Sequence, residues 1–281
     1  MVNEQIKFDL DTKQSLVVQS NSFAMARYDM STLEQKMFLI LLSTISKSDD
    51  CFKQTTFRVI DIAKIMDIHP NVLYRDLKKI CKNLLSKVYE VSNSNGDWEL
   101  INIIGYAKYE GKYGIVTFKL NEQAKPYLLQ LKEYFFGFKL DNVLLLDGKY
   151  SIRLYQQAKS HLNLKSYTIY VDEFINELRL TQKSYSKYGN IKAKIIEPSL
   201  KEINSKTDIN VSYEDIKLGK KVIAIKFYVK SKIHNQQKVI VKKSNKNSFN
   251  NFESREYYYK ELERRLLGWD DIDGKNPTCL K

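Results

Sequence analysis

The sequence predicts an α+β protein in which one module, a group of helices followed by a β-hairpin, occurs twice. Each copy shows a long helix, a short strand, a short helix, a turn, a helix with a basic outer face and a hairpin. Helix, strand, basic turn and strand is the order found in a winged helix. We therefore predict two tandem winged-helix domains related by pseudo-duplication, followed by a C-terminal basic tail with a short helix.

The predicted domain boundaries follow changes in composition along the chain. Residues 1–14 are polar and are expected to form a flexible N-terminus. Residues 15–148 hold the N-terminal winged-helix domain and residues 149–231 the C-terminal one. Residues 232–281 begin as lysines alternating with asparagine and serine, which is typical of a basic linker, and end in a short helical tail. The aromatic and aliphatic run at residues 134–148 predicts a packed, stiff junction between the two domains.

Caps and apolar spacing predict the elements of the N-terminal domain. Ser31 and Glu34 form a capping box that begins a long helix. Asp61 follows a strand at residues 57–59 and is expected to cap the short helix after it, as Asp172 is in the second domain. The next helix turns a basic face outward, with Arg75, Lys78, Lys79 and Lys82 as candidates for accessory DNA binding. Strands are expected at residues 88–91, 98–109 and 115–120, and a further helix at residues 122–133.

In the second copy, the stretch most informative about function is residues 183–229. A polar, basic and aromatic run leads into a helix at residues 191–205, where isoleucine and leucine recur at helical spacing. Pro198 lies inside this pattern, so either one helix is kinked or two helices meet near Glu197. Because the apolar positions stay in phase across the proline, we favour one kinked helix. Strands at residues 209–214 and 221–229, joined by a basic turn at residues 215–220, complete the wing.

Lysines cluster at the positions where such a module would meet double-stranded DNA. Ammonium groups there can displace counterions from phosphates, and Ser, Tyr and Asn side chains can bond phosphates or base edges. A solvated lysine face is the alternative interpretation for the helix taken by itself. The candidate DNA-binding residues are Lys183, Ser184, Tyr185, Ser186, Lys187, Tyr188, Asn190, Lys192, Lys194, Lys201, Lys217, Lys220 and Lys221.

Composition indicates a polyanionic partner. The chain of 281 residues carries a formal net charge of +13, with a pI near 9.3. This charge favours nucleic acid over a membrane, because there is no basic amphipathic anchor and no apolar run of the roughly 20 residues that span a bilayer. The 3 cysteines have no paired spacing, so neither a disulfide framework nor a zinc site is predicted, and a reducing cytoplasm is expected.

The sequence carries no signature of catalysis, so we predict no enzyme activity, no cofactor and no metal. The chain has no Gly-x-x-x-x-Gly-Lys loop of the kind that binds ATP phosphates. Its histidines, His69, His161 and His234, are far apart and include no His-x-His pair, which a rolling-circle nickase needs to hold its metal. The acidic residues around Asp172 and Glu177 fit helix capping and dipole compensation better than a metal cluster.

The order of several motifs resembles that of the Rep_3 family of theta-type plasmid replication initiators. In chain order these motifs are Val18-x-Ser20-Asn21, residues 31–36, residues 126–128 before an aromatic run, residues 150–155, residues 202–204 with Asp208, and Tyr213-Glu214 before residues 222–227. The resemblance covers roughly residues 16–229. Its specificity lies in the order and spacing of all the motifs together.

The resemblance implies a bacterial, cytoplasmic initiator that binds directly repeated origin sequences, called iterons, and controls plasmid copy number. The C-terminal domain would make the sequence-specific contacts, through a reading helix at residues 190–205 and a wing at residues 217–221. The N-terminal domain would contact neighbouring DNA and form the interface in homodimers. Monomers, in equilibrium with dimers, would open the origin and help recruit the host initiator ATPase and the replicative helicase. Dimers would repress the promoter of the protein's own gene.

A winged-helix transcriptional repressor without a replication role is the alternative to this reading. The same fold and the same charge serve both functions. Maintenance of a plasmid by the gene and its flanking repeats would discriminate between them.

Overall fold

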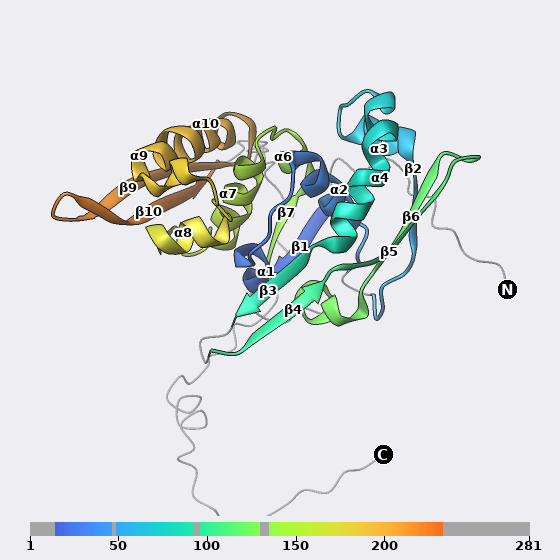
Figure 1. Cartoon of the computed structure of the whole chain (residues 1–281), viewed down its shortest axis with the longest axis horizontal. Coiled ribbons are helices and arrows are strands. Elements are labelled where there is room, and N and C mark those ends of the chain that lie inside the picture. The colour runs from blue at the N-terminus through green and yellow to red at the C-terminus, as the bar shows by residue number, and fades with distance from the viewer. Residues whose placement is uncertain (1–14, 47–48, 93–95, 130–134, 233–281) are drawn as a thin grey trace, which may run out of the picture. The chain divides into compact units, whose positions relative to one another are not determined.

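The computed structural model describes residues 15–46, 49–92, 96–129 and 135–232, and all of these belong to one compact unit. The predicted flexible N-terminus and the predicted basic tail with its short helix lie outside these residues. The described residues form two modules of helices and antiparallel strands, with the second module on the left of Figure 1 and the first on the right.

The first module is built on a three-stranded antiparallel sheet with the order β2-β6-β5. Its strands are β2 (Thr55–Arg58), β5 (Ile104–Glu110) and β6 (Ile115–Leu120), and its main helices are α2 (Thr32–Leu42), α3 (Val59–Ile65) and α4 (Pro70–Ser86). Helix α4 buries Leu73, Leu77, Ile80 and Leu84. Its basic residues are exposed, as predicted: Arg75, Lys78, Lys79 and Lys82.

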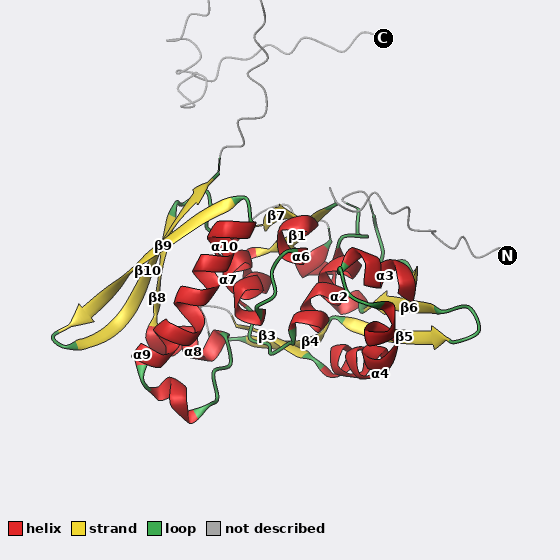
Figure 2. Ribbon diagram, turned by 90° about the horizontal axis from the view of Figure 1, so that it is seen from above, coloured by secondary structure: helices red, strands yellow, loops and turns green. Residues whose placement is uncertain are grey.

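The second module repeats this topology with a sheet of the order β8-β10-β9. It consists of α7 (Lys149–Ser160), β8 (Ser166–Tyr170), α8 (Val171–Glu177), the 3-10 helix η3 (Lys183–Ser186), α9 (Tyr188–Ile191), η4 (Lys192–Ile196), α10 (Glu197–Lys206), β9 (Ile209–Leu218) and β10 (Lys221–Ser231). In each sheet the last strand lies between the first and the second. Figure 2 shows the helices of this module gathered against its sheet. The predicted tandem, duplicated winged-helix fold is therefore confirmed.

Two further antiparallel ribbons lie outside the three-stranded sheets. One pairs β3 (Val88–Ser92) with β4 (Trp98–Asn102), and the other pairs β1 (Leu16–Ser20) with β7 (Phe135–Lys139). The single strand predicted at residues 98–109 is wrong, because the chain changes its pairing partner between β4 and β5. The remaining short helices are α1 (Asn21–Met25), the 3-10 helix η2 (Glu122–Ala124), α5 (Lys125–Leu128) and α6 (Leu140–Leu144).

Predictions about three helix ends are wrong. The N-caps of α3 and α8 are Arg58 and Tyr170, because each strand runs directly into its helix and no turn separates them. Asp61 and Asp172 therefore lie in the first turn, where a carboxylate compensates the helix dipole without capping. The helix expected at residues 122–133 ends at Leu128, since the next residue has extended backbone angles of φ −128° and ψ 149°.

Helix α7 forms the junction between the two modules. On its first-module side, Arg153 is buried, and its Nη2 donates a hydrogen bond of 2.8 Å to the carbonyl of Ala26. At its N-terminus, the Glu202 carboxylate from α10 accepts the backbone N–H groups of Asp147 and Gly148 at 2.7 and 3.2 Å. Five apolar residues before α7 are buried, namely Phe136, Phe138, Leu140, Val143 and Leu146, whereas Phe135 and Leu145 of the same run are exposed.

The capping box predicted at the start of α2 is present. Ser31 Oγ accepts the N–H of Glu34 at 3.4 Å, and the Glu34 carboxylate accepts the N–H of Ser31 at 3.0 Å. The same carboxylate accepts a 2.6 Å hydrogen bond from Asn83 Nδ2 on α4. The capping box therefore also ties α2 to the basic-faced helix of its module.

We expect Ser31→Ala to lower the free energy of unfolding by about 1 kcal/mol, because an N–H at the start of α2 loses its acceptor. Urea unfolding monitored by circular dichroism measures this loss. Ser205→Ala, on the exposed side of α10, is the matched control and should change the free energy by less than about 0.5 kcal/mol. An unchanged unfolding midpoint for Ser31→Ala would contradict the stabilising role of the cap.

Candidate nucleic-acid interface

Residues 188–206 form one continuous helix in the second module, which we call the reading helix. It comprises α9, the π-helical turn η4 and α10, and the residues at each join keep right-handed helical angles. Its apolar side is buried against the module through Ile191, Ile195, Ile196, Leu200 and Ile203. The prediction of one helix through Pro198 is confirmed, and the deformation is a π turn.

The π turn accommodates Pro198 within the helix. Proline has no N–H, so it cannot continue the pattern of bonds to the carbonyl four residues earlier. In η4 the bond spacing lengthens, and the Glu197 N–H donates to the carbonyl of Lys192, five residues earlier. Pro198 then falls in the first turn of α10, where its missing donor is tolerated.

The exposed face of the reading helix is mainly basic and also carries Glu197. Lys194 and Lys201 project to solvent on this face, one on each side of Pro198. Ahead of the helix, Lys183, Ser186 and Lys187 are also exposed. These five side chains are exposed, and their role as DNA contacts stays a prediction.

Two residues predicted to contact DNA, Tyr185 before the reading helix and Asn190 in its first turn, have structural roles instead. Tyr185 is only 9% exposed and packs in the core, so its selection as a DNA contact is wrong. Asn190 is half-buried, and its Nδ2 donates a 2.6 Å hydrogen bond to the carbonyl of Ser184, which is itself half-buried. This bond closes the polar loop onto the first turn of the reading helix. Sequence periodicity could not reveal these contacts, because they depend on how the loop folds back.

The hairpin after the reading helix is longer than predicted and its turn is tighter. Strands β9 and β10 pair as far as Leu218 and Lys221, so only Gly219 and Lys220 form the turn, rather than residues 215–220. Gly219 has a φ of +62°, a backbone angle that glycine adopts without steric cost. Lys217, Lys220 and Lys221 are all exposed around this tip. These three lysines therefore lie around the tip of the β9–β10 ribbon, which projects from the module in Figure 1.

The base of this hairpin is tied to the reading helix by four polar residues, which we call the Asp215 cluster. The Asp215 carboxylate accepts hydrogen bonds from Tyr188 Oη and from Lys192 Nζ, the latter at 3.1 Å. Lys192 Nζ also lies 5.4 Å from the centre of the Tyr213 ring. The hydrogen bond to Asp215 raises the pKa of Lys192, and burial together with Asp215 raises the pKa of Tyr188. Tyr188 and Lys192, predicted as free DNA ligands, are thus engaged within the protein.

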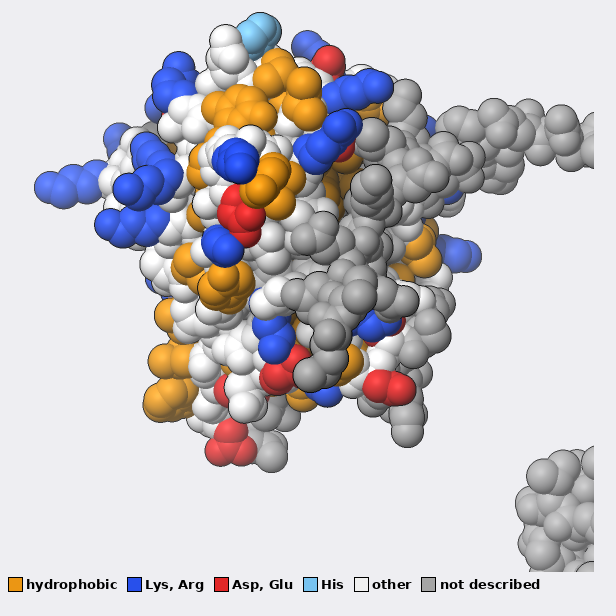
Figure 3. All heavy atoms as spheres, turned by 90° about the vertical axis from the view of Figure 1, so that its right-hand side faces the viewer, with side chains coloured by type: hydrophobic (Ala, Val, Ile, Leu, Met, Phe, Trp, Pro, Cys, Tyr) orange, Lys and Arg blue, Asp and Glu red, His pale blue; other side chains and the backbone are white. Residues whose placement is uncertain are grey.

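The first module offers a second basic surface. Lys78, Lys79 and Lys82 of α4 are exposed, whereas the guanidinium of Arg75 pairs with Asp76 at 2.9 Å. Figure 3 views this end of the molecule and shows Lys and Arg side chains interspersed with hydrophobic ones.

The tip of the β5–β6 hairpin also exposes a lysine and a tyrosine that the sequence interpretation did not single out. These are Lys112 and Tyr113, the latter 63% exposed. The signal that could have found them is the pair of glycines that flank them, because such glycines mark the turn of a wing.

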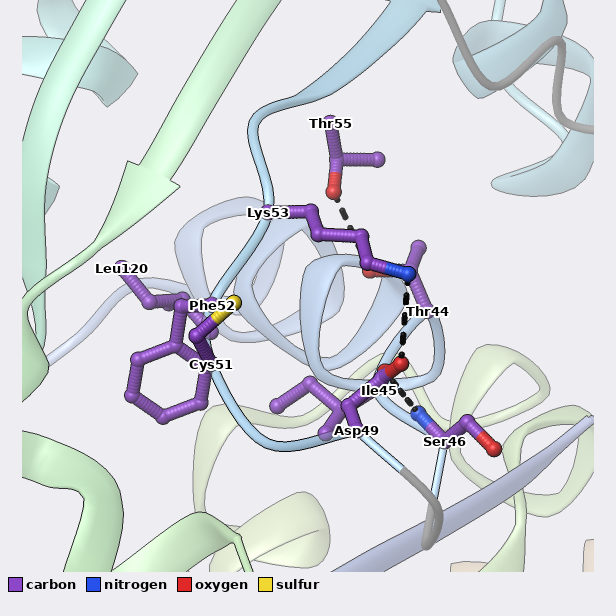
Figure 4. Close-up of a pocket in the computed structure, with 9 residues that line it drawn as sticks. All are labelled: Thr44, Ile45, Ser46, Asp49, Cys51, Phe52, Lys53, Thr55 and Leu120. Carbon is purple, nitrogen blue, oxygen red and sulfur yellow. Dashed lines mark hydrogen bonds and ion pairs between the residues drawn. The ribbon is translucent and has the colours of Figure 1, made fainter. Parts of the chain in front are cut away.

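A small pocket of about 200 Å³ lies between the end of α2 and the start of β2 (Figure 4). Its charged groups neutralise each other, since the Asp49 carboxylate lies 3.6 Å from Lys53 Nζ and accepts the N–H of Ser46 at 2.8 Å. Within the described ranges, no group of three or more His, Cys, Asp or Glu residues is placed to hold a metal ion. No helix in that part of the chain is long and apolar enough to cross a membrane.

Comparison with known proteins assigns both modules. A family model described as "Initiator Replication protein, WH1" matches residues 16–159, and one described as "Initiator Rep protein, WH2" matches residues 170–229. A curated relative from Escherichia coli, named replication initiation protein, is 26% identical over 206 residues, which are 70% of this chain and 64% of the relative. This chain therefore spans less than two thirds of the length of that relative.

Among solved structures, the crystal structure of a Pi initiator protein in complex with iteron DNA has a TM-score of 0.64 with this chain. The two share 23% identity, and the match covers 77% of this chain and 98% of that one. At this identity the likeness shows a shared fold. It agrees with the two tandem winged-helix modules described above.

Proposed function

Because the chain belongs to the initiator replication protein family, we propose that it is a plasmid replication initiator that binds directly repeated origin sequences in double-stranded DNA. The observation that carries the proposal is the reading helix, whose exposed face presents Lys194 and Lys201. The same module extends a wing with three exposed lysines at its tip. A helix and a ribbon that are both basic on their free sides fit a polyanion with grooves better than they fit a small substrate.

In this proposal the reading helix enters the major groove, which is wide enough to admit an α-helix. Lys194 and Lys201 contact phosphates or base edges there, and Lys217, Lys220 and Lys221 contact phosphates beside the groove. Lysine reads guanine less specifically than a bidentate arginine does. DNA shape and deformability therefore carry part of the sequence preference.

The first module supplies accessory contacts from Lys78, Lys79 and Lys82 to the neighbouring DNA segment. We place the functional division at residues 15–148 and 149–231, with α7 at the start of the second domain. Because α7 bonds Ala26 of the first module through Arg153 and Asp208 of the second module through Tyr155, the two basic surfaces keep a fixed spacing. Adjacent major grooves on one face of DNA repeat about every 34 Å, so a rigid pair of modules suits one repeat of about two helical turns.

We further propose the wider role that the resemblance to plasmid initiators implies. Monomers bind the repeats, and bending of the DNA strains adjacent A·T-rich sequence, at a cost of about 1–6 kcal/mol for smooth bending. The strained origin opens, and the bound initiator helps recruit the host initiator ATPase and the replicative helicase. A homodimer, in equilibrium with the monomer, represses the promoter of its own gene.

Footprinting on the DNA that flanks the gene tests this function. We expect protection of several direct repeats in one orientation, each spanning about two helical turns. Protection of only an inverted repeat over the promoter would favour a winged-helix repressor without a replication role. No protection of any flanking sequence would overturn both functions.

A further inference from the structure

We propose that Asp215 is a positioning residue that sets the direction of the wing relative to the reading helix, although its own charge repels DNA. The inference deepens the proposed function and rests on it. An aspartate at the edge of a DNA-binding surface is ordinarily unfavourable for binding. We expect its removal to weaken binding in this protein.

The first step of the argument is that the wing lacks support from its sheet. Strand β8 pairs with β10 only between Ala224 and Tyr228. Beyond Ala224 the hairpin continues as two strands alone, and the pairing of β9 with β10 is irregular between Val222 and Ala224. A bulge bends a strand, and a two-stranded ribbon by itself is only marginally stable. The direction of residues 216–223 is therefore set by the contacts at the base of the ribbon.

Asp215 lies at that base. It pairs with Ile225, within the part of the hairpin that the third strand still supports. Its side chain alternates with that of exposed Glu214 and so points to the face that meets the reading helix. There it accepts hydrogen bonds from Tyr188 Oη and from Lys192 Nζ, the latter 3.1 Å from Oδ2. The Asp215 side chain is only 17% exposed.

A second tie on the same face reinforces the first. Tyr213, two residues earlier on β9, donates a 3.2 Å hydrogen bond from its hydroxyl to Glu197 Oε1 of the reading helix. Lys192, held by Asp215, covers the Tyr213 ring. The two ties join β9 to the helix at successive positions along the strand. Charge-assisted bonds to a carboxylate are short and directional, so they fix an angle as well as a distance.

The direction of the change in DNA affinity when Asp215 is replaced by alanine separates a positioning role from a purely electrostatic one. If Asp215 acted only through its charge, its replacement by alanine would raise the net positive charge and strengthen binding to DNA. If it positions the wing, the same replacement leaves Lys217, Lys220 and Lys221 without a fixed direction. Each phosphate contact contributes about 0.9 to the slope of log K against log salt, so loss of wing contacts also flattens the salt dependence.

The experiment is a titration of the full-length protein on direct-repeat DNA at several salt concentrations, with Asp215→Ala, Asp215→Asn and Glu214→Gln. We expect Asp215→Ala to bind about tenfold more weakly at 0.15 M salt, with a salt slope lower by at least about 1. Asp215→Asn keeps an acceptor and should lose less. Glu214→Gln removes a charge from the opposite face of the same strand, where Glu214 accepts a 2.7 Å bond from Tyr228 Oη, and should bind no more weakly than the wild type.

Two further measurements test the contact from the helix side and, in a background without the wing lysines, exclude a general loss of folding. Tyr188→Phe removes one hydrogen-bond donor to Asp215 on the reading helix and does not change the net charge. It should reduce the affinity for DNA about threefold. In a background of Lys217→Ala, Lys220→Ala and Lys221→Ala, the change Asp215→Ala should cause no further loss, because the wing no longer contributes.

Wild-type binding together with equal or tighter binding by Asp215→Ala would overturn the inference and leave the proposed function standing. An equal loss in the background without wing lysines would also overturn it, because the effect would then be general destabilisation. Absence of any wild-type binding to the repeats would overturn the proposed function itself, and this inference with it.

Discussion

Reversing two charges on the reading helix, in the double variant Lys194→Glu and Lys201→Glu, is expected to weaken binding to direct-repeat DNA by about a hundredfold or more at 0.15 M salt. Each lost phosphate contact costs about fivefold at this salt through counterion release, and each introduced carboxylate adds repulsion of similar size. The salt slope should fall by about 2. Both side chains are exposed, so the fold should tolerate the change.

The matched control is the double variant Lys78→Glu and Lys79→Glu, which changes two exposed residues of helix α4 in the first module. Both double variants lose phosphate contacts, but only the reading-helix variant also loses contacts to base edges, so the loss for the control should be about tenfold smaller (about one log unit). Fluorescence anisotropy with both proteins at matched salt gives the comparison. Equal losses for the two double variants would contradict the assignment of sequence reading to the second module. Lys192 is left unchanged because it pairs with Asp215, and its loss would mix two effects.

The second large effect is a pH dependence of the free energy of unfolding that arises from Glu177. Glu177 of α8 is buried, and its carboxylate accepts a 2.7 Å hydrogen bond from Gln157 Nε2 on α7. Burial raises the pKa of Glu177 from 4.5 to about 7, against an opposing attraction from Arg153. Glu173 raises the same pKa further, and Arg27 lowers it.

The sign of this pH dependence follows from the protonation of Glu177 in the folded and in the unfolded state. The folded state holds a proton on Glu177 up to about pH 7, whereas the unfolded chain releases it near pH 4.5. The stability that this carboxyl contributes is therefore fully present below pH 4.5 and is lost as the pH rises through 7. At about 1.4 kcal/mol per pKa unit, the loss between pH 5 and pH 8 is about 2.5 kcal/mol.

Glu177→Gln should remove this pH dependence. Its amide oxygen can still accept from Gln157, so the variant should match the wild type at pH 5 and exceed it by about 2 kcal/mol at pH 8. Urea unfolding at pH 5, 6, 7 and 8 measures the difference between the two proteins, in which contributions from the histidines cancel. Asp172→Asn, exposed on the same helix, is the control and should keep the wild-type dependence. A constant difference between Glu177→Gln and wild type across this pH range would refute the prediction.

The sequence by itself determined the order of the elements and the faces they bury. Periodicity identified Ile191, Ile195 and Leu200 as core residues, because helix geometry alone decides which positions share a side. The capping box at Ser31 was readable for the same reason, since both partners lie within one turn. Even the duplication was visible, because each module repeats the same local signals.

Only the tertiary structure decided which polar groups are free. Lys194 and Lys192 look alike in the sequence, yet one is exposed and the other bonds Asp215, 23 residues away. Tyr185 is buried in the core of the folded protein, which its polar sequence neighbours did not indicate. Such pairings depend on how a helix and a hairpin pack, and local spacing does not encode the distance between them. The fold was therefore predictable from local pattern, whereas the division of the basic residues into those available to DNA and those that hold the wing required the packed module.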